Sequence, residues 1–161
     1  MDNDLFLQRK WTLRAEGKQV VFVKKSNESQ RHVLMKALIW ALYLPQYNGL
    51  RVEVSIGDRF KPDVVMLDDW QQPLFWGEAG EVGRKKIRKL VRKYPNTHFA
   101  MAKWESDLSP YVALVEREMR GVKRSAPFDL LRIRKDSAEK ISAKGHINIS
   151  FDDIEWVRLT G

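Results

Sequence analysis

Apolar and polar residues alternate most clearly in the middle of the chain, over residues 50–56, which is typical of a strand with one buried face. Two further apolar runs follow at residues 63–67 and 74–79, and a polar segment at residues 68–73 separates them. Strands joined by so short a connection pair as an antiparallel hairpin. The pattern therefore predicts three strands, of which the last two are direct neighbours.

Two longer helices are predicted from a different pattern. Residues 33–44 are apolar nearly all round, which indicates a buried helix that begins near Ser26-Asn27 and ends at Pro45. Residues 84–94 form a basic helix with a single apolar stripe, so only one side of it is expected to pack on the protein. The stripe consists of Ile87, Leu90, Val91 and Tyr94.

The remaining elements are shorter, and their order decides the fold class. Because strands precede and follow each helix, the chain is expected to form a mixed sheet with helices on its faces. The sequence therefore predicts a single α/β domain over residues 1–161. These elements are a hairpin of residues 5–13 and 19–25, a strand at 97–103, a helix at 110–120, a strand at 129–133, a short helix at 137–143 and a closing hairpin of residues 146–151 and 155–159.

Composition narrows the possible functions. The 161 residues contain no cysteine, which excludes disulfides, zinc–thiolate sites and cysteine nucleophiles. No apolar run reaches the roughly 20 residues of a membrane span, and the N-terminus lacks the features of a signal peptide. We therefore expect a cytoplasmic protein without a membrane partner. A formal net charge of +8 favours a polyanionic partner, and nucleic acid is the one we expect.

Two carboxylates occupy facing positions of the predicted hairpin. Asp63 and Glu78 are equally far from a loop centred between Trp70 and Gln71, so antiparallel pairing would set them opposite each other on one face. Carboxylates so close repel each other unless a cation lies between them, and Mg²⁺ or Mn²⁺ suits their oxygen atoms. A bulge or a one-residue slip would instead put the carboxylates on opposite faces. In the alternative interpretation, Asp63 only begins a strand after a proline turn and Glu78 faces solvent.

Basic side chains crowd the helix that follows Glu78. Like charges one turn apart oppose helix formation, and the phosphates of a nucleic acid would neutralise them. Lys85, early in this helix, could reach back to the carboxylates and there orient a water molecule or stabilise a phosphate. The alternative is a solvated face of a basic protein. The cluster comprises Arg84, Lys85, Lys86, Arg88, Lys89, Arg92 and Lys93.

Three short segments resemble the YaeQ-like family, and the resemblance extends over most of the chain. It implies the three-layer fold of the PD-(D/E)xK restriction endonucleases, in which a mixed central β-sheet is flanked by α-helices. The segments are Pro62-Asp63, Glu78-x-Gly80 and Lys85-x-Ile87-Arg88-Lys89.

The resemblance also implies a metal site. Asp63 and Glu78 would be its carboxylate ligands, with the Ala79 carbonyl and Glu28 as further ligands. The sequence departs from the nuclease pattern at Gly80, where that pattern places a lysine. The missing ammonium group would then come from Lys85 on the following helix.

These expectations lead to functional hypotheses of different kinds. In the first, the protein is a Mg²⁺- or Mn²⁺-dependent phosphodiesterase acting on DNA or RNA, as a monomer or a homodimer, with Asp63, Glu78 and Lys85 as catalytic residues. In the second, it is a non-catalytic nucleic-acid-binding or regulatory protein on a degenerate nuclease fold. In the third, it is a basic protein-interaction domain, since fold does not determine function. Nucleic acid would contact Arg84, Lys86, Arg88, Lys89 and Arg92.

Overall fold

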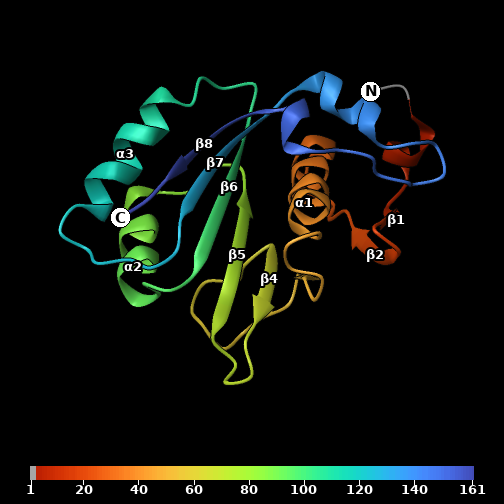
Figure 1. The fold of residues 1–161 in the computed structure, drawn as a ribbon. Coiled ribbons are helices and arrows are strands. Elements are labelled where there is room, and N and C mark those ends of the chain that lie inside the picture. Colours follow the sequence, from red (N-terminus) through yellow and green to blue (C-terminus); the bar gives the residue numbers. More distant parts are fainter. Residues whose placement is uncertain (1–2) are drawn as a thin grey trace.

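A mixed six-stranded sheet forms the centre of the computed structural model, which describes residues 3–161 (Figure 1). The strands lie in the order β3-β4-β5-β6-β7-β8. β4 is antiparallel to β3 and β5, whereas β5, β6 and β7 are parallel, and β8 is antiparallel to β7. Their bounds are Arg51–Val52 for β3, Val64–Leu67 for β4, Pro73–Ala79 for β5, His98–Trp104 for β6, Phe128–Ile133 for β7 and Glu155–Leu159 for β8.

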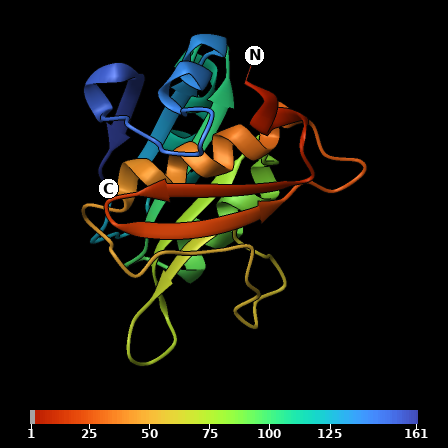
Figure 2. The ribbon, with the colours of Figure 1, turned by 90° about the vertical axis from the view of Figure 1, so that its right-hand side faces the viewer.

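Helices cover both faces of this sheet. α1 (Gln30–Tyr43) crosses one face, and α2 (Arg84–Lys93) and α3 (Ser109–Met119) pack on the other (Figure 1). A hairpin of β1 (Lys10–Ala15) and β2 (Lys18–Val23) covers the outer side of α1 (Figure 2). The predicted α/β class, a mixed sheet flanked by helices, is therefore confirmed. Within residues 3–161, no helix has both the length and the apolar character needed to cross a bilayer.

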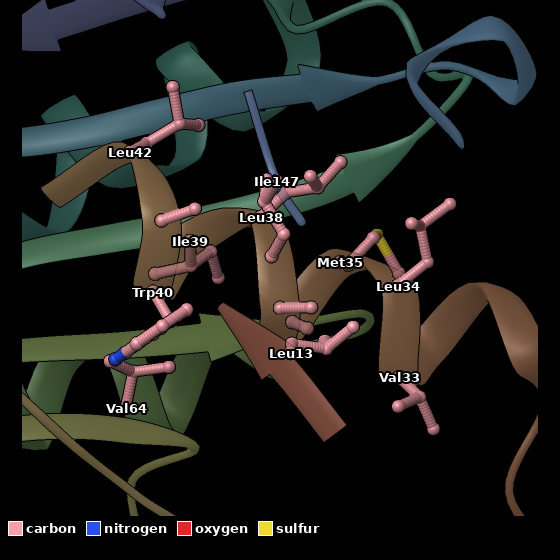
Figure 3. Packing of buried hydrophobic residues seen from close by; sticks show 14 of the residues in the cluster. Leu13, Val33, Leu34, Met35, Leu38, Ile39, Trp40, Leu42, Val64 and Ile147 are labelled. Atoms are coloured by element: carbon pink, nitrogen blue, oxygen red, sulfur yellow. The ribbon is translucent and has the colours of Figure 1, made fainter. Parts of the chain in front are cut away.

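α1 is buried on all sides because it lies between the sheet and the β1–β2 hairpin. Its N-cap is Ser29, which accepts a hydrogen bond from the His32 amide at 3.2 Å, slightly later than predicted. All residues from 33 to 43 are buried. Figure 3 shows Leu13 of β1 and Val64 of β4 packed around this helix. The uniformly apolar sequence therefore corresponds to a central core helix.

Alternate side chains of β5 pack on opposite faces of the sheet. Phe75 and Ala79 belong to the core on the α1 side, whereas Trp76 belongs to the core under α2 and α3. A Cβ atom at Gly77 would lie 2.7 Å from Cγ2 of Ile39, so α1 approaches β5 at a distance that glycine alone permits. The close approach fixes α1 over the end of β5 that carries the candidate site.

The C-terminal segment does not form the predicted closing hairpin. β8 pairs with β7, and a 3-10 helix, η3 (Phe151–Asp153), precedes it. Ile147 makes an isolated bridge with Ile141, and Ile149 packs on the α1-side core. The apolar alternation before η3 thus reflects packing of an irregular segment, while β8 covers the open edge of β7.

Three other elements also differ from the prediction. The strand predicted at residues 50–56 is limited to β3 because the chain turns at Glu53, which has a φ of 55°. The start of the strand predicted at residues 5–13 is a 3-10 helix, η1 (Asp4–Leu7), which buries two apolar side chains without pairing. The short helix predicted at residues 137–143 is the 3-10 helix η2 (Lys135–Lys140).

Candidate functional site

The register of β4 and β5 brings Asp63 and Glu78 to adjacent places in the sheet. Val64, Val65 and Met66 pair with Gly77, Trp76 and Phe75, which confirms the predicted register, and its bulge lies toward the hairpin tip. Asp63 is the next residue beyond the last pair. Its amide donates to the Gly77 carbonyl at 3.0 Å, and its Oδ2 accepts the Ala79 amide at 2.9 Å. Asp63 is therefore bonded to the two residues that flank Glu78 in β5.

Glu78 faces the α2 layer and is only 6% exposed. Its Oε1 accepts the indole N–H of Trp76 at 2.9 Å, and its Oε2 accepts the Lys86 ammonium at 2.8 Å. Burial raises the pKa of Glu78 by more than Lys86 and Trp76 lower it, and the nearby charge of Asp63 raises it further. The ionised carboxylate is thus less favourable here than in water.

Asp63 lies between the two layers and experiences charges from both. Burial raises its pKa, and this effect exceeds the opposing ones of the Ala79 amide, of Lys36 and His32 on α1, and of Lys86 on α2. Two neighbouring carboxylates with raised pKa values are an arrangement that occurs at functional sites and that a bound cation would relieve.

Two lysines approach these carboxylates, and neither is Lys85. Lys85 is exposed, whereas Lys86, the next residue, forms the ion pair with Glu78. Lys103, the last residue but one of β6, donates to the Gly80 carbonyl at 2.7 Å, with its ammonium 4.4 Å from the centre of the Tyr111 ring. Burial lowers the pKa of Lys103. An ammonium group from the neighbouring strand therefore lies beside Gly80, where the nuclease pattern places its lysine.

Glu28, two residues before α1, belongs to a separate cluster around the start of that helix. Its Oε2 lies 2.6 Å from His32 Nδ1 and 2.6 Å from the Lys36 ammonium, and Lys36 also binds Glu53. His32 Nε2 lies 3.2 Å from the Ala79 carbonyl. His32 thereby joins Glu28 to the backbone beside Glu78, a role that its isolated position in the sequence did not indicate.

A cavity of about 590 Å³ connects this cluster with Asp63. It opens between the start of α1, the segment before β4 and the ends of β5 and β6. Glu28, Asp63 and Lys103 all line it, whereas Glu78 is not part of its wall because it faces α2. The mouth also carries the exposed side chains of Lys25, Arg31 and Lys61.

The donors around Asp63 suit a magnesium ion better than a transition metal. Within residues 3–161, no group of three or more His, Cys, Asp or Glu side chains is close enough to hold a metal. Mg²⁺ often binds one or two carboxylates and keeps several waters. Of the predicted ligands, Asp63 lines the cavity, Glu78 is bound by Trp76 and Lys86, and the Ala79 carbonyl lies 3.2 Å from His32 Nε2. Glu28 is engaged by His32 and Lys36 instead.

Apart from Lys93, which binds Asp58, the basic residues of α2 point in three directions. Arg84 donates to Glu118 of α3 at 2.8 Å, and Arg88 lies 4.0 Å from the same carboxylate. Lys86 points inward to Glu78. The third direction is an outer stripe with i, i+4, i+7 spacing, whose members form no ion pair among residues 3–161. It consists of Lys85, Lys89 and Arg92, all exposed.

Replacing Asp63 by asparagine is expected to stabilise the protein at pH 7. Because the pKa of Asp63 lies above its ordinary value of 3.8, its stabilising contribution is largest below pH 3.8 and is lost as pH rises through the folded-state pKa. Asp63→Asn removes that loss. Calorimetry should show Tm raised by about 2–4 °C, the shift that about 1 kcal/mol produces in a chain of this size.

The gain should vanish below pH 3.8, where the wild-type carboxyl group is protonated in both states. Asp69→Asn, at an exposed position in the β4–β5 turn, is the matched control and should leave Tm unchanged. A lower Tm for Asp63→Asn at pH 7 would contradict the raised pKa.

Comparisons with known proteins identify the fold. No protein-family model and no curated protein matches the chain. The solved structure of a YaeQ protein from Pseudomonas syringae has a TM-score of 0.62 at 15% identity, over 91% of this chain and 87% of that one. That of the YaeQ protein from Xanthomonas axonopodis pv. citri has a TM-score of 0.52 at 14% identity, over 71% of this chain and 62% of that one, so the match spans less than two thirds of its length. The chain therefore has the fold of the YaeQ proteins, as its sequence motifs implied.

Proposed function

We propose that the protein is a metal-dependent phosphodiesterase acting on nucleic acid. The observation that carries this proposal is the position of Asp63, directly before β4 and bonded to the Ala79 amide, beside Glu78 on β5, with both carboxyl pKa values raised by burial. Lysine ammonium groups flank the pair on two sides. Carboxylates that favour a cation, next to cations that favour a phosphate, suit phosphodiester hydrolysis.

Each residue of the site has a distinct role in this proposal. A bound Mg²⁺ or Mn²⁺ would supply Lewis-acid chemistry, and Asp63, Glu78 and the Ala79 carbonyl would hold it. Lys103, whose pKa burial lowers, is suited to exchange a proton with the attacking water or to stabilise the phosphate. Lys86 would leave Glu78 and bind a phosphate oxygen. The outer stripe of α2 would bind the nucleic-acid backbone.

A cleavage assay tests the proposal. Purified protein is incubated with single- and double-stranded DNA and RNA in Mg²⁺ or Mn²⁺, and EDTA is then added. We expect metal-dependent cleavage that falls at least about 100-fold in Asp63→Asn, Glu78→Gln and Lys103→Met. Asp69→Asn is the matched control and should cleave normally. Undiminished cleavage by Asp63→Asn would exclude this mechanism.

A non-catalytic nucleic-acid-binding protein is the second candidate. Lys86 already forms an ion pair with Glu78, so this carboxylate has a cationic partner without a metal. Gly80 also stands where the nuclease pattern has its lysine. Isothermal titration with Mn²⁺ distinguishes the two candidates. A nuclease should bind Mn²⁺ more weakly in Asp63→Asn and more tightly in Lys86→Met, which frees Glu78. Nucleic-acid binding without cleavage or any effect of metal would favour the second candidate.

A further inference from the structure

A second cavity, of about 490 Å³, lies beside the outer stripe of α2, away from the cavity at Asp63. We call it the Phe60 groove. Its apolar surface comes from Phe60, in the segment before β4, and from Leu90 of α2. The other residues that line it are Asp58, Arg59, Lys89, Arg92 and Lys93.

The groove is fixed in shape by the side chain of Asp58, which is itself buried. Asp58 Oδ1 accepts the Phe60 amide at 2.8 Å, which closes a tight turn. Asp58 Oδ2 accepts the Lys93 ammonium at 2.7 Å and the Tyr94 hydroxyl. The segment before β4 is thereby attached to the C-terminal end of α2. A ligand that binds here has little ordering cost, because the groove already exists.

The rim of the groove carries unpaired positive charge. Arg59, Lys89 and Arg92 are exposed, and none of them forms an ion pair among the residues that the structure describes. Lys93 is neutralised by Asp58. An apolar floor with a cationic rim matches a planar aromatic group that carries phosphates on either side, which is the chemistry of a nucleotide within a strand.

Phe60 also connects the groove to the candidate metal site. The Arg59 guanidinium lies 5.4 Å and the Lys86 ammonium 5.1 Å from the centre of its ring. Lys86 is the same residue that binds Glu78. Phe60 precedes Asp63 by three residues, a reach of at most about 11 Å along an extended chain. A nucleotide in the groove would therefore be close to the one at the metal site in the same strand.

We propose that the Phe60 groove binds one unpaired base of a nucleic-acid strand against Phe60, with the flanking phosphates on Arg59, Lys89 and Arg92. The inference rests on the proposed function and deepens it, because a base can enter the groove only where it is unpaired. The preferred substrate is then a nucleic acid with a single-stranded segment next to the scissile phosphate.

Fluorescence anisotropy in EDTA measures this binding without cleavage or metal. The probe is a labelled single-stranded oligonucleotide, DNA and RNA in turn. Phe60→Ala should weaken binding by about 5- to 150-fold, the range measured for loss of a stacked base. Phe60→Tyr should retain it. Lys89→Gln and Arg92→Gln should each make the affinity less dependent on salt, whereas Phe60→Ala should leave the salt dependence unchanged.

Two variants control for effects on folding and for non-specific stacking. Phe60→Leu keeps apolar volume but lacks an aromatic face, so it should fold, as circular dichroism would report, and still lose affinity. Trp70→Ala removes an 80% exposed aromatic residue at the tip of the β4–β5 hairpin, which does not line the groove, and should bind normally.

Three outcomes would overturn the proposal. They are unchanged single-strand affinity in both Phe60→Ala and Phe60→Leu, an equal loss of affinity for blunt duplex, and tighter binding of an acidic peptide than of the oligonucleotide. Because the measurement contains no metal, an absence of cleavage would contradict the phosphodiesterase proposal and leave base binding standing. Loss of base binding with normal cleavage would contradict base binding in the Phe60 groove and leave the phosphodiesterase proposal standing.

Discussion

Asp129→Ala should destabilise the protein by about 3–5 kcal/mol, the usual cost of removing one partner from a buried ionic network. Such a loss corresponds to a fall in Tm of about 6–20 °C for a chain of this size. Asp129 lies on β7 and is 0% exposed. Urea denaturation at pH 7, followed by circular dichroism, measures the change in the free energy of unfolding.

The size of this effect follows from the number of donors that depend on Asp129. Its Oδ2 accepts the Tyr43 hydroxyl at 2.6 Å, His98 Nε2 at 2.7 Å and Arg158 Nη2 at 3.0 Å, while its Oδ1 accepts Arg158 Nε at 2.9 Å. The Tyr47 hydroxyl lies 2.9 Å from His98 Nδ1, so the His98 ring bridges Tyr47 and Asp129. Alanine would leave the buried Tyr43 hydroxyl and His98 Nε2 without an acceptor, whereas the exposed Arg158 could turn to water.

The pH dependence of the effect identifies the carboxylate as its cause. Burial alone would raise the pKa of Asp129, but hydrogen bonds from His98, Arg158 and Tyr43 outweigh it and hold the pKa below its ordinary value of 3.8. The contribution of Asp129 is therefore present above pH 3.8 and is lost as pH falls through the folded-state pKa. The exposed Asp136 serves as control, and Asp136→Ala should change stability by less than about 0.5 kcal/mol. Equal stabilities of Asp129→Ala and the wild type would contradict a stabilising network.

The sequence patterns predicted those features of the site that depend on segments adjacent in the sequence. The register of the β4–β5 hairpin follows from its short loop. It brings Asp63 next to the strand that carries Glu78, but Asp63 lines the cavity at the start of α1, whereas Glu78 is bound by Trp76 and Lys86 on the α2 side. The apolar stripe of α2 likewise predicted which side of that helix packs on the sheet, and Ile87, Leu90 and Val91 are buried there. Fold class followed from the order of such segments.

The remaining features of the site depend on contacts between segments far apart in sequence. One residue along a helix turns a side chain by about 100°, so the packing of Ile87 directs Lys86 rather than Lys85 toward Glu78. Lys103 lies beside Gly80 only because β5 and β6 are parallel in one particular register. The only sign of Lys103 in the sequence was a lysine at the end of an otherwise apolar predicted strand. Asp129 gathers partners from α1, β6 and β8, which no local pattern reveals.

A second large effect is expected at Lys36, the charged residue of α1 that is only 3% exposed. Burial by itself would lower its pKa, but hydrogen bonds and charge from Glu28 and Glu53 outweigh it and raise the pKa above 10.5. Lys36→Met keeps a similar length of side chain and removes the cation. It removes the cation that Glu28 and Glu53 share and leaves Glu28 with only His32 and the Lys25 amide, and a loss of about 3–5 kcal/mol is expected at pH 7.

The loss should depend on pH in a direction that follows from Glu28. In the wild type, hydrogen bonds from Lys36, Lys25 and His32 overcome burial and lower the pKa of Glu28 below 4.5, so its contribution is present above pH 4.5 and lost as pH falls through the folded-state pKa. In Lys36→Met the carboxylates repel each other only while ionised. The difference between variant and wild type should therefore shrink as pH falls through 4.5, which urea denaturation at pH 7 and pH 4 would measure.

Neutral partners provide the decisive control for Lys36. Adding Glu28→Gln and Glu53→Gln to Lys36→Met removes the stranded charges, and most of the lost stability should return, because replacing a whole buried ionic group costs far less than breaking it. Lys85→Met, on the exposed side of α2, should have little effect. A triple variant as unstable as Lys36→Met alone would mean that Lys36 acts through packing of its methylene groups and not through its charge. Recovery would instead establish that the cluster beneath the Asp63 cavity is held together by one buried cation, whose charge also lowers the pKa of Asp63.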